Sequence, residues 1–299
     1  MNYASVHLTH LDNLWFQVSG TLCNIACTHC FNRSGPGVRT FGLLEIRQVR
    51  ESLETACRKG VKEIFFTGGE PFLHPQLPEM MELCLAVAPT TVLTNGLLIN
   101  DRTADRLAEL EKQSRYSLEI RVSLDGWSEE MNDAIRGRGV FKQVMAALAR
   151  LCQRGLLPLV TVVRTWREAE EMDVLAGFMS FLAEAGYARP RIKILPALPL
   201  GRELSRSTEA RADAPLLSEE LLKDFDRGLL MCSNSRLVTD RGVWGCPLLV
   251  EMPDARLGAR LEDAASVYDL RHHACMSCYY YGTICGNVSP QIEGLEKPR

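Results

Sequence analysis

The chain has 299 residues, a formal net charge of −3 and 46 % hydrophobic residues. This composition predicts a sizeable folded core and excludes an intrinsically disordered protein, and the balanced charge gives no electrostatic reason to expect nucleic acid or an anionic membrane as a partner. The first residues contain no basic segment followed by an apolar run, and no apolar stretch approaches membrane-spanning length, so we expect a cytoplasmic protein.

Short apolar runs alternate with segments of helical periodicity through the first two thirds of the chain. The runs, which we expect to form strands, cover residues 14–18, 62–67, 91–95, 118–125, 159–165 and 191–196. The segments with helical periodicity cover residues 44–59, 76–88, 102–113, 141–154 and 168–185. This alternation predicts an α/β fold with a parallel sheet and right-handed crossovers. Six strands are too few for a closed eight-stranded barrel, so we expect a partial (β/α)6 TIM-like barrel with its ligand site at the carboxyl ends of the strands.

The pattern changes after the sixth strand. Residues 197–217 are polar and rich in Arg, Ala and Pro, which indicates a linker between a barrel domain at 1–196 and a small Cys-rich domain at 218–299. We expect a helix near 218–230 and a hairpin that turns at 240–242 in the C-terminal part.

Three cysteines follow the first predicted strand in the spacing C-x3-C-x2-C. They are Cys23, Cys27 and Cys30, with the aromatic Phe31 directly after the last. Three thiolates can hold three irons of a [4Fe–4S] cluster and leave the fourth iron open to another ligand. A zinc site that uses His29 as its fourth ligand is the alternative, but adjacent residues such as His29 and Cys30 rarely reach one ion together.

This spacing resembles the radical S-adenosylmethionine (SAM) superfamily. The resemblance implies a partial barrel, a [4Fe–4S] cluster on this loop, and SAM that chelates the open iron through its amino and carboxylate groups. It further implies reductive cleavage of SAM to a 5′-deoxyadenosyl radical, with the electron supplied by an external reductant such as flavodoxin or ferredoxin.

Further candidate cofactor-binding residues lie near the ends of the predicted strands. Gly68, Gly69 and Glu70 resemble the superfamily's GGE motif, which implies contact with the SAM amino group, and the glycines would let the backbone approach a ligand closely. The resemblance also makes Ser123 and Arg136 plausible SAM contacts, although each residue taken singly is equally compatible with a capping or surface role. The full candidate set is Phe31, Gly68, Gly69, Glu70, Thr94, Asn95, Ser123, Asp125, Arg136 and Arg164.

A second group of cysteines lies in the tail at Cys232, Cys246, Cys275, Cys278 and Cys285. These cysteines resemble the twitch domain, a shortened form of the seven-cysteine SPASM extension, which implies one auxiliary [4Fe–4S] cluster. The preceding segment 195–202 resembles the bridging element of those enzymes. A structural zinc ion, with a neighbouring histidine among its ligands, is the alternative.

An auxiliary cluster needs four ligands, so one of the five thiols is spare. We expect Cys246 to be a hydrogen-atom donor and Cys232, Cys275, Cys278 and Cys285 to be the ligands. In the alternative assignment, Cys246 is a ligand and Cys285 is free. In a third, none of the five reacts.

The expected function is a radical SAM epimerase that inverts a sugar carbon of an aminoglycoside antibiotic, because the chain most resembles that kind of enzyme. A polycationic substrate needs carboxylates, and Asp125, Glu119, Glu129 and Glu130 are the candidates. The alternatives are a dehydrogenase of a sugar alcohol or aminocyclitol and a peptide-modifying maturase. An iron–sulfur electron carrier or zinc-binding module would explain the cysteines but not the polar motifs at the strand ends.

Overall fold

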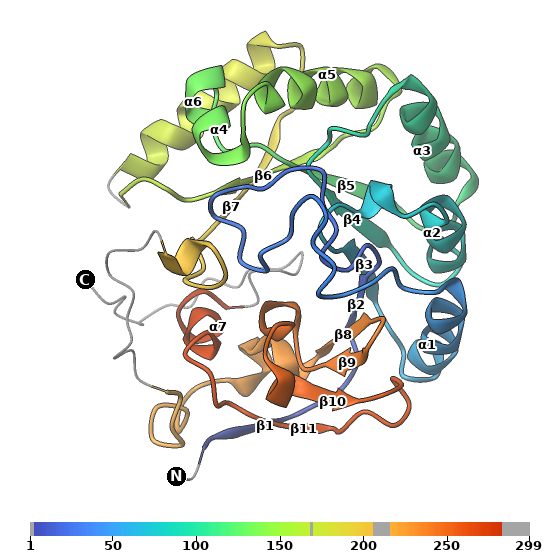
Figure 1. Cartoon of the computed structure of the whole chain (residues 1–299), viewed down its shortest axis with the longest axis vertical. Coiled ribbons are helices and arrows are strands. Elements are labelled where there is room, and N and C mark those ends of the chain that lie inside the picture. Colours follow the sequence, from blue (N-terminus) through green and yellow to red (C-terminus); the bar gives the residue numbers. More distant parts are fainter. Residues whose placement is uncertain (1–2, 168–169, 206–215, 283–299) are drawn as a thin grey trace.

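The computed structural model describes residues 3–167, 170–205 and 216–282 (Figure 1). Its main sheet has nine strands in the order β10-β9-β8-β2-β3-β4-β5-β6-β7, and β1 and β11 form a separate antiparallel pair. The strands are β1 (Ser5–His7), β2 (Asn13–Gln17), β3 (Glu63–Thr67), β4 (Thr90–Thr94), β5 (Leu118–Ser123), β6 (Leu159–Val163), β7 (Arg191–Leu195), β8 (Ser235–Thr239), β9 (Gly242–Trp244), β10 (Arg256–Gly258) and β11 (Val267–Asp269).

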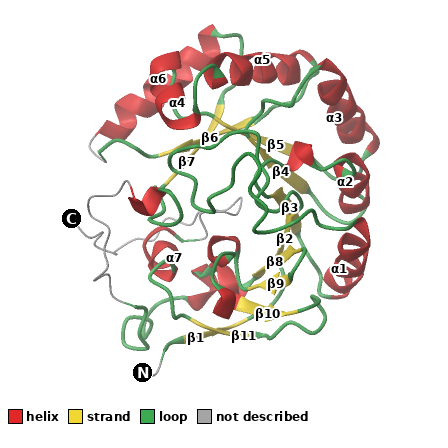
Figure 2. Cartoon of the chain, viewed as in Figure 1, coloured by secondary structure: helices red, strands yellow, loops and turns green. Residues whose placement is uncertain are grey.

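The six strands expected from the apolar runs are all present, as β2 to β7, and they pair in parallel in chain order. The expected α/β class with a mostly parallel central sheet is therefore confirmed, while closure into a partial TIM-like barrel stays a prediction. Long helices connect the strands and form an arc outside them (Figure 2). The helices are α1 (Ile46–Arg58), α2 (Leu77–Leu85), α3 (Asp101–Gln113), α4 (Glu129–Arg136), α5 (Val140–Gln153), α6 (Glu171–Glu184) and α7 (Cys275–Tyr281). Within the described ranges, no helix is long and apolar enough to cross a membrane.

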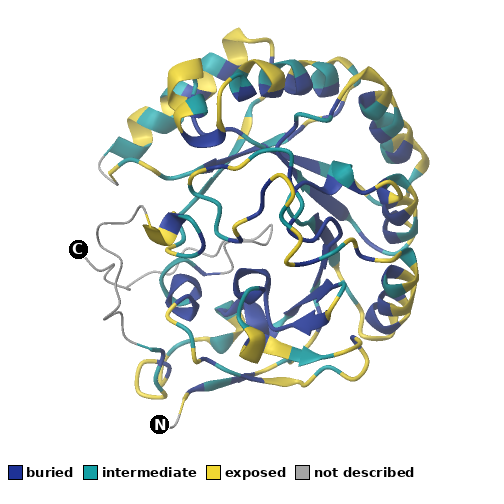
Figure 3. Cartoon of the chain, in the orientation of Figure 1, coloured by how far each residue is buried: buried dark blue, intermediate teal, exposed yellow. Residues whose placement is uncertain are grey.

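Alternation along β2 separates two hydrophobic cores, because successive strand residues point to opposite faces of a sheet. Leu14 and Phe16 pack in the larger core, together with the buried faces of the helices (Figure 3). Trp15 belongs to the second core and stacks on Phe65 of β3, with ring centroids 4.2 Å apart. The face of the sheet that carries Trp15 also borders the cavity described below.

The C-terminal part of the chain extends the same sheet. Strand β8 pairs in parallel with β2, and β9 and β10 follow it as antiparallel neighbours. The predicted hairpin is confirmed, since β8 and β9 flank its turn and Gly242 has a φ of +123°. The domain division 1–196, 197–217 and 218–299 stays a prediction.

The prediction of a helix near 218–230 is wrong. Turns occupy 219–224, and only a short 3-10 segment, Arg227–Leu229, follows them. The Asp226 side chain accepts a hydrogen bond from the Gly228 backbone N–H at 2.8 Å. Such local side-chain bonds compete with helical backbone bonding.

Candidate functional site

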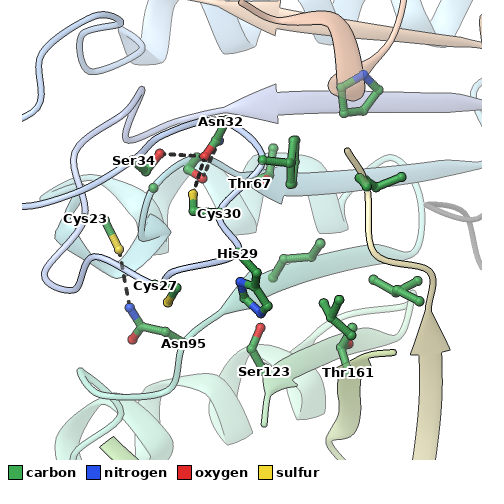
Figure 4. A pocket seen from close by; sticks show the side chains of 18 of the residues that line it. Cys23, Cys27, His29, Cys30, Asn32, Ser34, Thr67, Asn95, Ser123 and Thr161 are labelled. Carbon is green, nitrogen blue, oxygen red and sulfur yellow. Dashed lines mark hydrogen bonds between the residues drawn. The ribbon is translucent and has the colours of Figure 1, made fainter. Parts of the chain in front are cut away.

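The three N-terminal cysteines lie on the loop between β2 and α1, at the carboxyl end of the sheet. Cys23, Cys27 and Cys30 all line one cavity of about 220 Å³, which Ser123 and Asn95 also border from the ends of β5 and β4 (Figure 4). This edge of a parallel sheet is where ligands bind in α/β folds. Three thiols beside polar strand ends suit a cluster with one open iron, so this donor set fits the group that the sequence implies.

The GGE turn, Gly68 to Glu70, follows β3 and forms backbone hydrogen bonds with the cysteine loop. The N–H of Gly69 donates to Gly20 O at 2.8 Å, and the N–H of Glu70 donates to Leu22 O at 2.9 Å. A Cβ atom on Gly69 would lie 2.1 Å from Leu22 O. Gly69 therefore permits close approach to the cysteine loop. Gly68 and Gly69 also line the cavity, so their expected approach to a ligand stays a prediction.

Glu70 is completely buried and does not line the cavity. Its carboxylate accepts hydrogen bonds from Thr94 Oγ1 at 2.7 Å, from the Asn95 N–H at 2.8 Å and from the Phe72 N–H at 3.1 Å. Burial raises the pKa of Glu70 to about 7, against these three hydrogen bonds, which lower it. The side chain thus ties the end of β4 to the GGE turn.

Replacing Glu70 with Gln is expected to destabilise the fold by about 1–3 kcal/mol, because the new amide N–H₂ group faces hydrogen-bond donors. The pH dependence follows from the raised pKa. The contribution of Glu70 to stability is full below its ordinary pKa of 4.5 and is lost as pH rises through about 7. Urea unfolding between pH 4 and pH 8 should therefore show a flatter profile for Glu70→Gln than for the unaltered chain. Glu79→Gln, at an exposed position, should keep the original profile.

Asp125 forms the centre of a buried polar group. Its Oδ2 atom lies 2.7 Å from His29 Nε2 and 2.7 Å from Arg136 Nε, and its Oδ1 atom accepts from the Val163 N–H at 2.9 Å. Burial alone would raise the pKa of Asp125, but Arg136 and His29 hold it at about 2. The carboxylate is therefore charged and already has partners, which leaves it unsuited to the role of a free acceptor for a ribose or a substrate amine.

His29 and Arg136 both border the cavity. Asp125, which is not among the lining residues, contacts both side chains and holds them in place. The sequence had suggested His29 only as a zinc ligand, although its place beside Cys30 in the loop was a usable signal for a cavity position. Arg136 lies where the resemblance placed it, but Asp125 already neutralises its charge.

The remaining candidates divide into two groups. Phe31 and Thr94 line the cavity with Ser123 and Asn95, whose side-chain N–H₂ group donates to Asn24 Oδ1 at 2.7 Å. Arg164 is not among the lining residues. Its guanidinium pairs with Glu171 at 3.2 Å and donates to Tyr281 OH at 3.4 Å.

Arg202, which the sequence did not single out, clamps the cysteine loop. Its Nε atom donates to Cys27 O at 2.7 Å, its Nη2 atom to Ser34 O at 2.6 Å, and its backbone N–H to Cys30 O at 2.9 Å. Gly201 precedes it with a φ of +57°, and a Cβ there would lie 2.3 Å from Phe31 O. The one available signal was the segment 195–202, whose resemblance to a bridging element did not indicate which residue makes the contact.

Replacing Arg202 with Gln should loosen the cysteine loop, because two side-chain hydrogen bonds to its carbonyl oxygens are lost. We expect SAM to bind about tenfold more weakly, which corresponds to about 1.4 kcal/mol. Equilibrium dialysis with radiolabelled SAM under anaerobic conditions measures this change. Arg39→Gln removes an exposed arginine from the same loop and should leave the affinity unchanged.

The cysteines of the tail form a second group. Cys232, Cys246, Cys275 and Cys278 are all buried and line one small cavity of about 20 Å³, with Tyr268 beside them. The pKa of Cys275 is raised to about 12, mainly by burial and in smaller part by the neighbouring Cys278. Four thiols that line one cavity match the number of ligands that one [4Fe–4S] cluster needs, so these residues fit an auxiliary cluster by their chemistry.

This arrangement bears on the assignment of the spare thiol. Cys246 lies with three of the expected ligands, which favours the alternative in which it is a ligand itself. Cys285 lies outside the described residues. Within the ranges that the structure describes, no three His, Cys, Asp or Glu side chains converge closely enough to hold a single metal ion.

Comparison with known proteins matches this chain to one protein family and to several relatives. Residues 18–166 match the family described as the Radical SAM superfamily. Mycofactocin maturase MftC of Mycobacterium tuberculosis is 34 % identical over 73 % of this chain and 51 % of the relative. The antilisterial bacteriocin subtilosin biosynthesis protein AlbA of Bacillus subtilis is 31 % identical over 47 % of this chain and 30 % of the relative. The chain thus spans about half of MftC and less of AlbA.

A solved structure with a similar fold is Streptococcus suis SuiB bound to its precursor peptide SuiA. It has a TM-score of 0.62 and 17 % identity, with 86 % of this chain and 64 % of that chain covered. A resemblance to neomycin C epimerase or another aminoglycoside epimerase is not shown by these matches. Through residues 18–166, the chain belongs to the Radical SAM superfamily, which implies SAM and a [4Fe–4S] cluster as its cofactors.

Proposed function

We propose that this chain is a radical SAM enzyme that modifies a peptide. The relatives support this proposal, since one is named a maturase, another takes part in bacteriocin biosynthesis, and the SuiB structure holds a precursor peptide. The observation that carries it is the lining of the cavity beside the cysteine loop, which is mostly apolar and, among the described residues, holds no carboxylate.

The charged residues that line this cavity are Arg121, Arg136 and Arg202, and no Asp or Glu is among its lining residues within the described chain. Ten apolar side chains make up much of the wall: Trp15, Ile25, Phe31, Leu93, Val163, Leu195, Pro196, Leu198, Pro247 and Leu248. A polycation entering this space would lose water and meet no carboxylate among the described lining residues, which is costly. An apolar or neutral side chain of a peptide would not pay this desolvation cost on entering the cavity.

The carboxylates expected to bind an aminoglycoside lie elsewhere. Asp125 pairs with Arg136 and His29, and Glu119 pairs with Arg121 at 2.9 Å and with Arg191 at 2.6 Å. Two more, Glu129 and Glu130, are exposed in the first turn of α4. The expected polycationic substrate therefore has no support at this site.

We propose the following roles for the chain's own residues. Cys23, Cys27 and Cys30 would hold the first cluster, and the clamp by Arg202 fixes their loop. Asp125 orients His29 and Arg136 at the cavity wall, and the apolar wall excludes water from the reacting centre. When bound to this cluster, SAM supplies a 5′-deoxyadenosyl radical that abstracts a hydrogen atom from the substrate.

We propose that Cys232, Cys246, Cys275 and Cys278 hold an auxiliary [4Fe–4S] cluster. Such a cluster can accept an electron from a substrate radical, whereas an epimerase needs a free thiol to return a hydrogen atom. The burial of Cys246 among the other three thiols supports the ligand role. An external one-electron reductant, such as flavodoxin or ferredoxin, remains part of the proposal.

The experiment compares two substrate classes on anaerobically reconstituted enzyme with SAM and a reductant. Short peptides encoded beside the gene are one class, and neomycin is the other. We expect mass spectrometry to show a mass change or new cross-link in a peptide and no change in neomycin, with Cys27→Ala inactive as the control. Conversion of neomycin, with every peptide unchanged, would overturn the proposal.

A further inference from the structure

Arg236 of β8 is a buried cation beside the four-thiol cavity. Its side chain has no exposed surface, and it ranks among the largest fully buried side chains of the described chain. The guanidinium donates to Cys232 O at 2.7 Å and to Ser235 O at 2.8 Å through Nη1. Through Nη2 it donates to Ala265 O at 3.2 Å and to Ser266 O at 3.3 Å.

All four of these acceptors are neutral carbonyl oxygens. Among the described residues, no Asp or Glu forms an ion pair with Arg236. The other buried arginines do have such partners, since Arg121 pairs with Glu119 and Arg136 with Asp125. Carbonyl dipoles solvate a guanidinium but do not neutralise it, and a buried charge without a counter-charge is costly.

Cys232 and Cys246 of the four-thiol cavity are the acidic groups that act on Arg236. A guanidinium stays protonated in proteins, so Arg236 is positive at neutral pH. A [4Fe–4S] core held by four thiolates carries a net negative charge, and such an anion would complete the buried pair.

We propose that Arg236 is the counter-ion of the auxiliary cluster and that its charge raises the reduction potential of that cluster. This inference rests on the auxiliary-cluster part of the proposed function. One-electron reduction adds a negative charge to the cluster, and a nearby buried cation stabilises the more negative state. In a low-dielectric interior such a Coulomb interaction is strong, and net charge is a recognised determinant of cluster potentials.

The test uses the full chain with Cys23, Cys27 and Cys30 all replaced by Ala, so that bound iron reports on the tail site. In this background we compare Arg236, Arg236→Gln and Arg236→Lys, with Arg227→Gln as the control. Arg227 lies in the same part of the chain but is only half-buried, pairs with Glu219 and donates to Ser5 O. The readouts are iron per chain and a redox titration followed by electron paramagnetic resonance (EPR).

Arg236→Gln should shift the one-electron reduction equilibrium about tenfold toward the oxidised cluster, which is about 59 mV lower in potential. Arg236→Lys and Arg227→Gln should retain the original potential. Loss of iron in Arg236→Gln with retention in Arg236→Lys would also support the proposal, because the two variants differ in charge.

An unchanged potential in Arg236→Gln would overturn the proposal, as would loss of iron in both the Gln and the Lys variants, which would indicate a structural role. If the background with Arg236 intact binds no iron, the inference fails together with the auxiliary cluster. In that case, SAM cleavage and peptide modification by the unaltered chain would still support the rest of the proposed function.

Discussion

Replacing Cys246 with Ala is expected to reduce the iron content from about eight to about four per chain, as for loss of one of two [4Fe–4S] clusters. The reason is its position, since it lines the same small cavity as Cys232, Cys275 and Cys278. The three remaining thiolates would leave one iron of the auxiliary cluster without a protein ligand. Iron and sulfide analysis of the anaerobically reconstituted protein measures the change.

Two controls make this result specific. Cys84→Ala removes a buried cysteine of α2 that packs in the larger core, and it should keep all the iron. Cys285→Ala should keep all the iron as well, if the ligand set is the one proposed here. The opposite pattern, in which Cys285→Ala loses half the iron and Cys246→Ala keeps it, would restore Cys246 as the candidate hydrogen-atom donor.

Replacing Asp125 with Asn should destabilise the fold by about 3–5 kcal/mol, because it leaves the buried guanidinium of Arg136 without its counter-charge. The pKa of Asp125 is held at about 2, below the ordinary aspartate value of 3.8. The contribution of Asp125 to stability is therefore full above pH 3.8 and is lost as the pH falls through about 2. Urea unfolding at neutral pH measures the full effect.

The matched control for this prediction is Glu171→Gln, which breaks the pair of Glu171 with Arg164. Because that pair is partly exposed, water screens it, and we expect a loss below about 1 kcal/mol. Equal losses for the two variants would contradict the account, since they would show that the Asp125 group contributes no more than a surface pair.

The sequence predicted the six parallel strands well because the evidence for them is local. Each strand is a short apolar run between segments of helical periodicity, so its position does not depend on distant residues. The pairing of β8 with β2 is different, since it joins residues more than two hundred positions apart, and no local pattern predicts it. The prediction of a helix near 218–230 is wrong, since turns occupy 219–224 and only a 3-10 segment, Arg227–Leu229, follows them.

At the site, the sequence identified the residue types but not their partners. Glu70 was expected to face a ligand, yet its hydrogen-bond donors come mainly from the end of β4, twenty-four and twenty-five residues further on. Arg202 reaches back to Cys27 across 175 positions. Such contacts depend on how the strands and loops assemble, and a single sequence contains no periodic trace of them.

The substrate was the least predictable part, because it was inferred from resemblance and not from any residue at the site. The structure shows that the acidic residues expected to bind a polycation are paired with other side chains or exposed elsewhere, so the cavity does not support that substrate. Asp125 shows the difference clearly. Its place after β5 was predicted correctly, but its charge is already balanced by Arg136 and His29.

The central claim is that Cys23, Cys27 and Cys30 hold a cluster with one iron left for SAM. The most direct measurement is the EPR spectrum of the reduced protein before and after SAM is added, together with an assay for 5′-deoxyadenosine. We predict a clear change in the cluster signal and release of 5′-deoxyadenosine, both absent in Cys27→Ala. An unchanged spectrum and no 5′-deoxyadenosine, in protein shown to contain the cluster, would contradict the account.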